Sequence, residues 1–164
     1  MKALLAYAKA NILTTRHICQ GEYTKNVERS SKTYDLALLF AALSDRTRLR
    51  LLNLMDGREV CVCYFVEILG QSQPKISRHL AYLRRAGVVA ARREGKWMHY
   101  KIVVPSHIGA ARILRETIAV IREEKAMQAD LARLGRACCV PPKFSALESA
   151  PLPIRIDPVG CSAC

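Results

Sequence analysis

Hydrophobic residues recur at the three- and four-residue spacing of helices through most of the region between residues 34 and 134. The stripes are formed by Leu36, Leu39, Phe40 and Leu43; by Leu49, Leu52 and Met55; by Phe65, Ile68 and Leu69; by Ile76, Leu80 and Leu83; and by Ile108, Ala111, Leu114, Ile118 and Ile121. Asp45 and Ser72 are typical of helix starts, and Gly57, Gly70 and Gly87 of helix ends. The pattern predicts five helices, the last a long one over 105–134.

Between the fourth and fifth helices the pattern changes to that of strands. Residues 88–93 and 97–103 are rich in β-branched and aromatic side chains, and Glu94-Gly95 is a turn signal between them. Four helices, a hairpin and a helix form the order of a winged helix-turn-helix, a mainly α fold with a β-hairpin wing (α+β). The last helix is too long for one domain to cover, so we expect a homodimer that pairs through these terminal helices.

The two ends of the chain show no such periodicity. We assign 1–33 to an N-terminal arm, 34–104 to the winged helix-turn-helix domain, 105–134 to the dimerisation helix and 135–164 to a tail rich in cysteine and proline. Five of the seven prolines lie between Pro141 and Pro158, a density that excludes a helix or a central strand there. No run is long and apolar enough to span a bilayer, so we expect a cytoplasmic protein that does not bind membranes.

Basic side chains are concentrated in the fourth helix and the hairpin. The thirty residues from Ser72 to Lys101 hold eight Lys or Arg and one acid, within a chain of net charge +12. Such an excess favours a polyanion such as nucleic acid. A helix from Ser72 has its apolar stripe on one side and polar groups opposite, as a major-groove helix needs. The predicted DNA contacts are Gln73, Lys75, Ser77, Arg78, His79, Tyr82 and Arg85 on the helix and Arg92, Arg93 and Lys96 on the wing.

Three runs of sequence in this region resemble one known family. They are ALSDRTRLRLL from residue 42, SQPKISRHLAYLRRAG from residue 72 and REGKWMHYKI from residue 93. These runs are similar to the second helix, the recognition helix and the wing of the ArsR/SmtB family of metal-responsive repressors. The resemblance covers 34–104 and, more loosely, the helix that follows. It implies a homodimeric repressor that binds double-stranded operator DNA and leaves it when a metal binds.

Six of the seven cysteines occur in pairs. The pairs are Cys61/Cys63, Cys138/Cys139 and Cys161/Cys164, with Cys19 alone. An odd count without a convincing signal peptide argues against a disulfide framework, and paired thiols indicate soft-metal or redox chemistry. The segment VCVC from residue 60 resembles the one that carries inducer ligands in the arsenic- and cadmium/lead-responsive branches of the family. The arsenic-responsive pattern has a third cysteine where this chain has Val66.

Arsenite and antimonite favour three thiolates, because soft ligands select soft ions. The resemblance therefore implies arsenite or antimonite as the inducer, with Cys61 and Cys63 as two ligands. We favour Cys138 or Cys139 for the third thiolate, and Cys19 or the Cys161/Cys164 pair are alternatives. We place Cys61 and Cys63 at the start of the third helix, where their side chains point about 200° apart. Ion binding is then expected to unwind the first turn of that helix and displace the recognition helix.

Three other functions are compatible with parts of the sequence. A cadmium, lead or zinc sensor of the same fold would combine Cys61 and Cys63 with Cys19. A thiol redox switch would oxidise Cys61/Cys63 or Cys138/Cys139, although adjacent cysteines strain a disulfide. Passive metal sequestration would not need the basic helix. No Ser/His/Asp set, phosphate-binding glycine loop or pair of acids placed for hydrolysis is present, so we expect no enzymatic activity.

Overall fold

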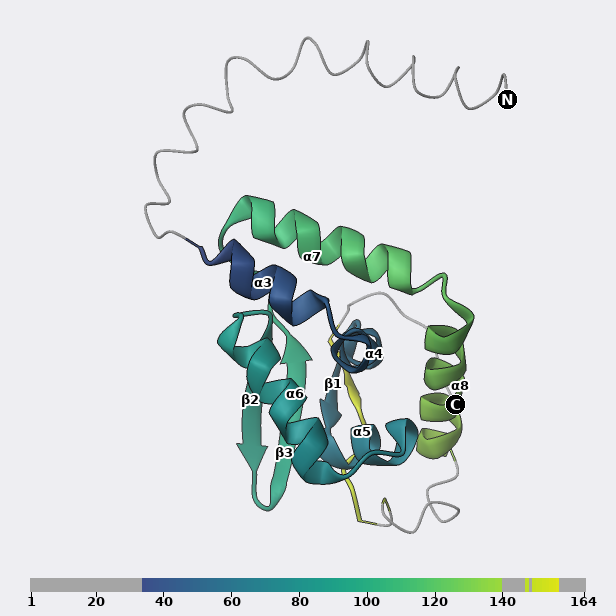
Figure 1. Cartoon of the computed structure of the whole chain (residues 1–164). Helices are drawn as coiled ribbons and strands as arrows, with labels where there is room; N and C mark the ends of the chain where they lie inside the picture. The colour runs from purple at the N-terminus through teal and green to yellow at the C-terminus, as the bar shows by residue number, and fades with distance from the viewer. Residues whose placement is uncertain (1–33, 140–146, 148, 157–164) are drawn as a thin grey trace, which may run out of the picture. The chain divides into compact units, whose positions relative to one another are not determined.

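A computed structural model describes residues 34–139, 147 and 149–156 (Figure 1). Its helices are α3 (Leu36–Leu43), α4 (Arg46–Met55), α5 (Val62–Leu69), α6 (Gln73–Arg85), α7 (Ile108–Ile121) and α8 (Lys125–Cys139), and its strands are β1 (Arg58–Cys61), β2 (Val89–Glu94), β3 (Trp97–Ile102) and β4 (Ile154–Arg155). Among the described residues, four helices precede the β2–β3 hairpin and two, α7 and α8, follow it. The predicted fold class, mainly α with a β-hairpin wing, is confirmed.

The helix boundaries follow the predicted capping residues. The Asp45 carboxylate accepts a hydrogen bond from the Arg48 backbone N–H at 2.9 Å and starts α4. Gly70 ends α5 with φ of 61°, a left-handed conformation that glycine adopts without strain. The segment between α5 and α6 is therefore only Gly70–Ser72, so the position of α5 fixes where α6 begins.

The core lies where α4, α5 and α6 meet. Leu51, Leu52 and Leu54 of α4 are fully buried, as is Phe65 of α5. The strands pack against these helices, and the Phe65 and Tyr100 rings lie 6.4 Å apart between centroids. The fold therefore holds the recognition segment on a continuous apolar base.

A four-stranded antiparallel sheet, in the order β2-β3-β1-β4, contains two strands that the sequence pattern does not predict. The strand β1 has four residues, and its pairing with β3 sets Cys61 opposite His99. The two-residue strand β4 pairs with the other edge of β1. The region assigned to a tail, 135–164, thus contains a strand, and the edge position of β4 is consistent with the exclusion of a central strand there.

The prediction of one long helix over 105–134 is wrong. The chain forms α7, turns over Arg122–Glu124 and continues as α8 to Cys139, so 135–139 is helical rather than tail. A straight helix of that length would extend about 45 Å and leave the domain. The turn lets Ile121 and Met127, on either side of it, both become buried.

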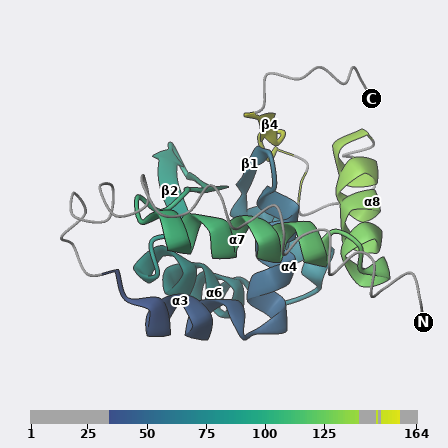
Figure 2. The same cartoon turned by 90° about the horizontal axis from the view of Figure 1, so that it is seen from above.

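Polar contacts hold α8 on the same domain. The Arg50 guanidinium donates two hydrogen bonds to the Asp130 carboxylate, at 2.6 and 2.7 Å, and the Asn53 amide donates to the Met127 carbonyl at 2.9 Å. Both views show α8 and the β2–β3 wing on opposite sides of the domain (Figures 1 and 2). Among the described residues, no helix has both the length and the apolar composition needed to cross a bilayer.

Candidate nucleic-acid interface and dithiol site

The predicted recognition helix is α6, and its two faces differ as expected. Ile76, Leu80 and Leu83 are fully buried, so one face anchors the helix to the core. Gln73, Lys75, Arg78 and Arg85 are exposed on the remaining surface, and Ser77 is half-buried. Arg84 and Arg85 lie in the last turn, where cations interact favourably with the helix dipole. The helix is thus both firmly seated and positively charged toward solvent.

Two of the residues predicted to contact DNA, His79 and Tyr82, are half-buried. The His79 Nδ1 atom lies 3.3 Å from an Asp45 carboxylate oxygen, and burial lowers the His79 pKa although Asp45 opposes the shift. The Arg48 guanidinium carbon lies 4.6 Å from the centroid of the Tyr82 ring, a cation–π contact. Arg48, which the sequence analysis did not select, joins Lys75 and Arg78 around a hollow of about 330 Å³. Such a hollow with three cations suits an anion.

The basic residues of the wing differ in whether carboxylates pair with their charges. Arg93 and Lys96 are exposed at the turn of the hairpin, where Gly95 adopts a φ of 57°. The Arg92 guanidinium instead donates to Glu59 at 2.6 and 2.8 Å and to Glu94 at 2.6 Å. Arg92 thus ties the wing to β1, and two carboxylates balance its charge. His99, on the neighbouring strand, is buried.

The sulfur atoms of Cys61 and Cys63 lie 2.7 Å apart. Cys61 ends β1 and precedes the first residue of α5, with an extended backbone (φ −69°, ψ 144°). Cys61 and Cys63 therefore do not lie on one helix with their side chains pointing apart, and that prediction is wrong. Both sulfurs already face one another, so binding one ion to both does not require α5 to unwind.

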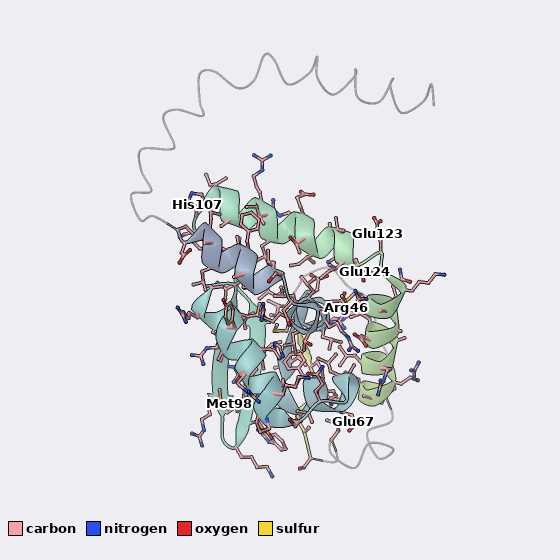
Figure 3. All side chains as sticks on the ribbon, in the orientation of Figure 1. Arg46, Glu67, Met98, His107, Glu123 and Glu124 are labelled. Carbon is pink, nitrogen blue, oxygen red and sulfur yellow. The ribbon has the colours of Figure 1, made fainter. Side chains whose placement is uncertain are left out.

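The environment of the pair favours one thiolate on Cys61. The hydrogen bond from Cys63 lowers the Cys61 pKa to about 7, burial opposes it, and the backbone N–H groups of Cys63, Met98 and Val62 add to the lowering. The pKa of Cys63 is raised, because its thiol is the donor in this hydrogen bond and is partly buried. Met98 belongs to the wing strand β3 (Figure 3), so the Cys61 sulfur contacts the wing as well as α5.

We expect Cys61 to titrate near pH 7, as a thiol below and a thiolate above. Since the hydrogen bond from Cys63 is the largest cause, Cys63→Ala should raise the Cys61 pKa toward the ordinary value of 9.0. The measurement is a pH titration of ultraviolet thiolate absorbance, taken as the difference from Cys61→Ser. The variant Cys138→Ser is the control and should leave the transition in place. An unmoved transition in Cys63→Ala contradicts the assignment.

The other predicted ligands lie at the end of α8. Cys138 is a half-buried free thiol, and burial raises its pKa although Arg58 opposes the shift. Cys139 is exposed and disulfide-bonded, which makes Cys138 the better ligand of the two. Cys19, Cys161 and Cys164 lie outside the described residues. Within 34–139, 147 and 149–156, no three His, Cys, Asp or Glu side chains are grouped as a metal site.

Tyr64 directly follows Cys63 in α5, the helix on which α8 packs. Burial raises its pKa to about 12, and the sulfurs of Cys138, Cys63 and Cys61 are near enough to raise it further, in that order of effect. The side chain is fully buried. Tyr64 is not among the predicted site residues, because a tyrosine inside an apolar helix gives no signal of function in the sequence.

A basic helix seated on an apolar core, followed by an antiparallel hairpin with a basic turn, defines a winged helix-turn-helix DNA-binding protein. Residues 45–91 match the model of the bacterial regulatory protein arsR family. The chain is also 42% identical over 102 residues to the arsenical resistance operon repressor of Escherichia coli K12, a match covering 62% of this chain and 86% of that relative. The chain belongs to the arsR family and is a transcription regulator, not an enzyme.

Two further similarities cover less of the molecule. An arsenic resistance transcriptional regulator of Pseudomonas putida is 47% identical over 66 residues, which are 40% of this chain and about half, 52%, of that protein. Among solved structures, the AntR antimony-specific transcriptional repressor is 31% identical, with a TM-score of 0.43 over 53% of this chain and 77% of that one.

Proposed function

We propose that the chain is a repressor that binds operator DNA through α6 and the wing, and that arsenite or antimonite releases it by binding Cys61, Cys63 and Cys138. The observation that carries the proposal is the 2.7 Å approach of the Cys61 and Cys63 sulfurs at the junction of β1 and α5. The relatedness to an arsenical resistance operon repressor, at 42% identity, supports arsenite as the ion. Soft thiolates suit both metalloids.

The exchange of ligands balances without an oxidant. One As(OH)₃ molecule reacts with three thiols to give As(SR)₃ and three water molecules, so each As–O bond is replaced by an As–S bond and each thiol proton leaves in water. The Cys61 thiolate makes the first bond, because its pKa is near 7 and it is the better nucleophile. Cys63 follows at once because its sulfur is adjacent. Cys138 closes the site by movement at the end of α8.

On DNA, α6 occupies the major groove, and its exposed residues contact bases and phosphates. The proposed contacts are Gln73, Lys75, Ser77, Arg78 and Arg85, with Tyr82 and His79 at the edge of the helix and Arg93 and Lys96 on the wing. Arginine reads guanine and glutamine reads adenine, whereas lysine and serine hold phosphate. Arg92 contributes by fixing the wing to Glu59 rather than through a free charge.

Release follows from where Cys61 and Cys63 sit. An ion bound to both sulfurs replaces the hydrogen bond between them and moves the junction of β1 and α5. That junction is paired with the wing strand through Cys61 and His99, and it leads through α5 and Gly70–Ser72 into α6. Both DNA-binding elements are therefore displaced together. Linkage requires DNA to weaken ion binding by the same factor.

A dimer of this chain explains the apolar residues that one copy leaves exposed on α3 and α7. Leu36 and Phe40 of α3 are 41% and 55% exposed, and Ile108 and Val120 of α7 are both 65% exposed. Burying these side chains against a second copy stabilises a dimer by the hydrophobic effect. Two copies related by a twofold axis would present two α6 helices to one operator.

The test is DNA binding by fluorescence anisotropy on the chain's own promoter region, titrated with arsenite, antimonite, cadmium and zinc under reducing conditions. We expect arsenite and antimonite to release the DNA, Cys138→Ser to lose most of this response, and the neighbouring Cys139→Ser to keep it. Release by cadmium alone, unchanged in Cys138→Ser, would instead indicate a cadmium sensor. If no ion releases the DNA, the adjacent Cys61 and Cys63 thiols favour a redox switch.

A further inference from the structure

Tyr64 carries a buried hydroxyl that the free protein does not use. The side chain is fully buried in α5, and its Oη atom has no hydrogen-bond partner among the described residues. Buried polar atoms are nearly always paired, so an unpaired one calls for an explanation. Leaving the hydroxyl unpaired costs free energy that a phenylalanine would not incur. This cost is explained if the hydroxyl acquires its partner in a second state of the protein.

The surroundings of the hydroxyl identify that partner. Tyr64 directly follows Cys63, and the sulfurs of Cys138, Cys63 and Cys61 are all near enough to affect it, with Cys138 the strongest. Cys138 reaches this place from α8, which packs on α4 and α5. None of the three is disulfide-bonded, and Cys61 and Cys63 are hydrogen-bonded to one another. Among the described residues, Cys138 is therefore the one of these three sulfurs that makes no hydrogen bond.

We propose that the Tyr64 hydroxyl is a positioning group for the metalloid site, which donates a hydrogen bond to the Cys138 sulfur once that sulfur binds the ion. This inference rests on the proposed function, because it assigns a role within the same three-sulfur site. A phenol is an O–H donor at neutral pH, and a metal-bound sulfur in an apolar setting gains from such a donor. The hydrogen bond orients Cys138 toward the ion that Cys61 and Cys63 already hold.

If the Tyr64 hydroxyl acts in this way, its removal should weaken arsenite binding without lowering the stability of the free protein. A residue that only packs in the core would not show this difference. Tyr64→Phe removes only the hydroxyl and leaves the ring in the core. Since the hydroxyl is unpaired in the free protein, its loss should not lower the midpoint of thermal unfolding. Operator affinity without ions should also be unchanged. Only the ion-bound state should weaken, by about tenfold in arsenite affinity, as removal of a group supporting a metal ligand typically does.

The experiment titrates the full chain with arsenite under reducing conditions and follows the ultraviolet As–S charge-transfer absorbance. Five proteins are compared: wild type, Tyr64→Phe, Cys138→Ser, the double variant of these two changes, and Tyr100→Phe. Tyr100→Phe is the matched control, because Tyr100 is also buried but only Cys61 among the sulfurs affects it. We expect about tenfold weaker binding in Tyr64→Phe, wild-type binding in Tyr100→Phe, and no further loss when Tyr64→Phe is added to Cys138→Ser.

The outcomes separate this inference from the proposed function. Wild type that binds no arsenite would overturn the proposed function itself. Wild type that binds arsenite with an affinity equal to that of Tyr64→Phe would overturn the inference alone. A lowered unfolding midpoint in Tyr64→Phe would overturn it as well, since the hydroxyl would then have a partner before the ion arrives. A loss that persists undiminished in the Cys138→Ser background would show that Cys138 is not the acceptor.

Discussion

Replacement of both Cys61 and Cys63 by serine should abolish release by arsenite while leaving operator affinity unchanged. Serine has nearly the same shape, and the backbone N–H groups around residue 61 can donate to a hydroxyl as they do to the sulfur. A hydroxyl is a hard ligand with little affinity for a soft ion. Since loss of a supporting group alone costs about 10- to 100-fold in affinity, loss of two ligands should exceed a hundredfold. Anisotropy and As–S absorbance measure the two effects separately.

The control for the double serine variant is Arg78→Ala, which should lose operator affinity and keep arsenite binding. Arg78 is exposed on α6 and lies outside the dithiol site. Arg78→Ala should lose operator affinity, by about 1–3 kcal/mol if the side chain reads a base. Its arsenite absorbance should match wild type. If the double serine variant also loses DNA binding, the cysteines are needed for the fold and the assignment of Cys61 and Cys63 as purely inducer ligands fails.

Asp130→Ala should destabilise the protein by about 2–3 kcal/mol, the second large effect that we expect. Asp130 is buried and accepts both hydrogen bonds from Arg50, whose pKa is raised mainly by that hydrogen bond. Removing the carboxylate leaves a partly buried guanidinium without its partner. The Arg50 side chain is still 26% exposed, so water compensates in part and the expected cost lies below that of a fully buried pair. Denaturant unfolding measures the change.

Because Asp130 anchors the helix that ends in Cys138, the same variant should also weaken arsenite binding. Glu124→Ala is the matched control. Glu124 pairs with Arg46 at 3.0 Å, but their side chains are 39% and 65% exposed (Figure 3). An exposed pair contributes at most about 1 kcal/mol, so this variant should unfold nearly as wild type does. Equal costs for Asp130→Ala and Glu124→Ala would show that the buried pair does not anchor α8.

Local patterns were sufficient to predict the DNA-binding half of the molecule. Ile76, Leu80 and Leu83 repeat at helical spacing, and all three are buried as the period requires. The turn at Glu94-Gly95 depends on a glycine that accepts a positive φ, a property of the residue itself. Elements that arise from neighbours in sequence are therefore visible in the sequence.

Elements that depend on distant contacts were not predicted. The strand β1 exists because Val60 and Cys61 pair with β3 some forty residues later, so its four residues carry no period of their own. The break between α7 and α8 contains good helix formers, and its cause is tertiary, because the turn lets Ile121 and Met127 both pack into the domain. Because β1 was not predicted, Cys61 was assigned to the helix. The expectation that ion binding unwinds this helix depended on that assignment and is wrong for the same reason.

The short strand β4 also determines how the sheet meets other molecules. It covers the edge of β1, where the Ile156 N–H donates to the Gly57 carbonyl at 3.0 Å. An uncovered edge offers unpaired N–H and C=O groups that recruit strands from other chains and lead to aggregation. Pro153, directly before β4, has no N–H and so cannot donate a hydrogen bond to a further strand. Here the sheet ends in two residues beside a proline, which leaves little for another chain to extend.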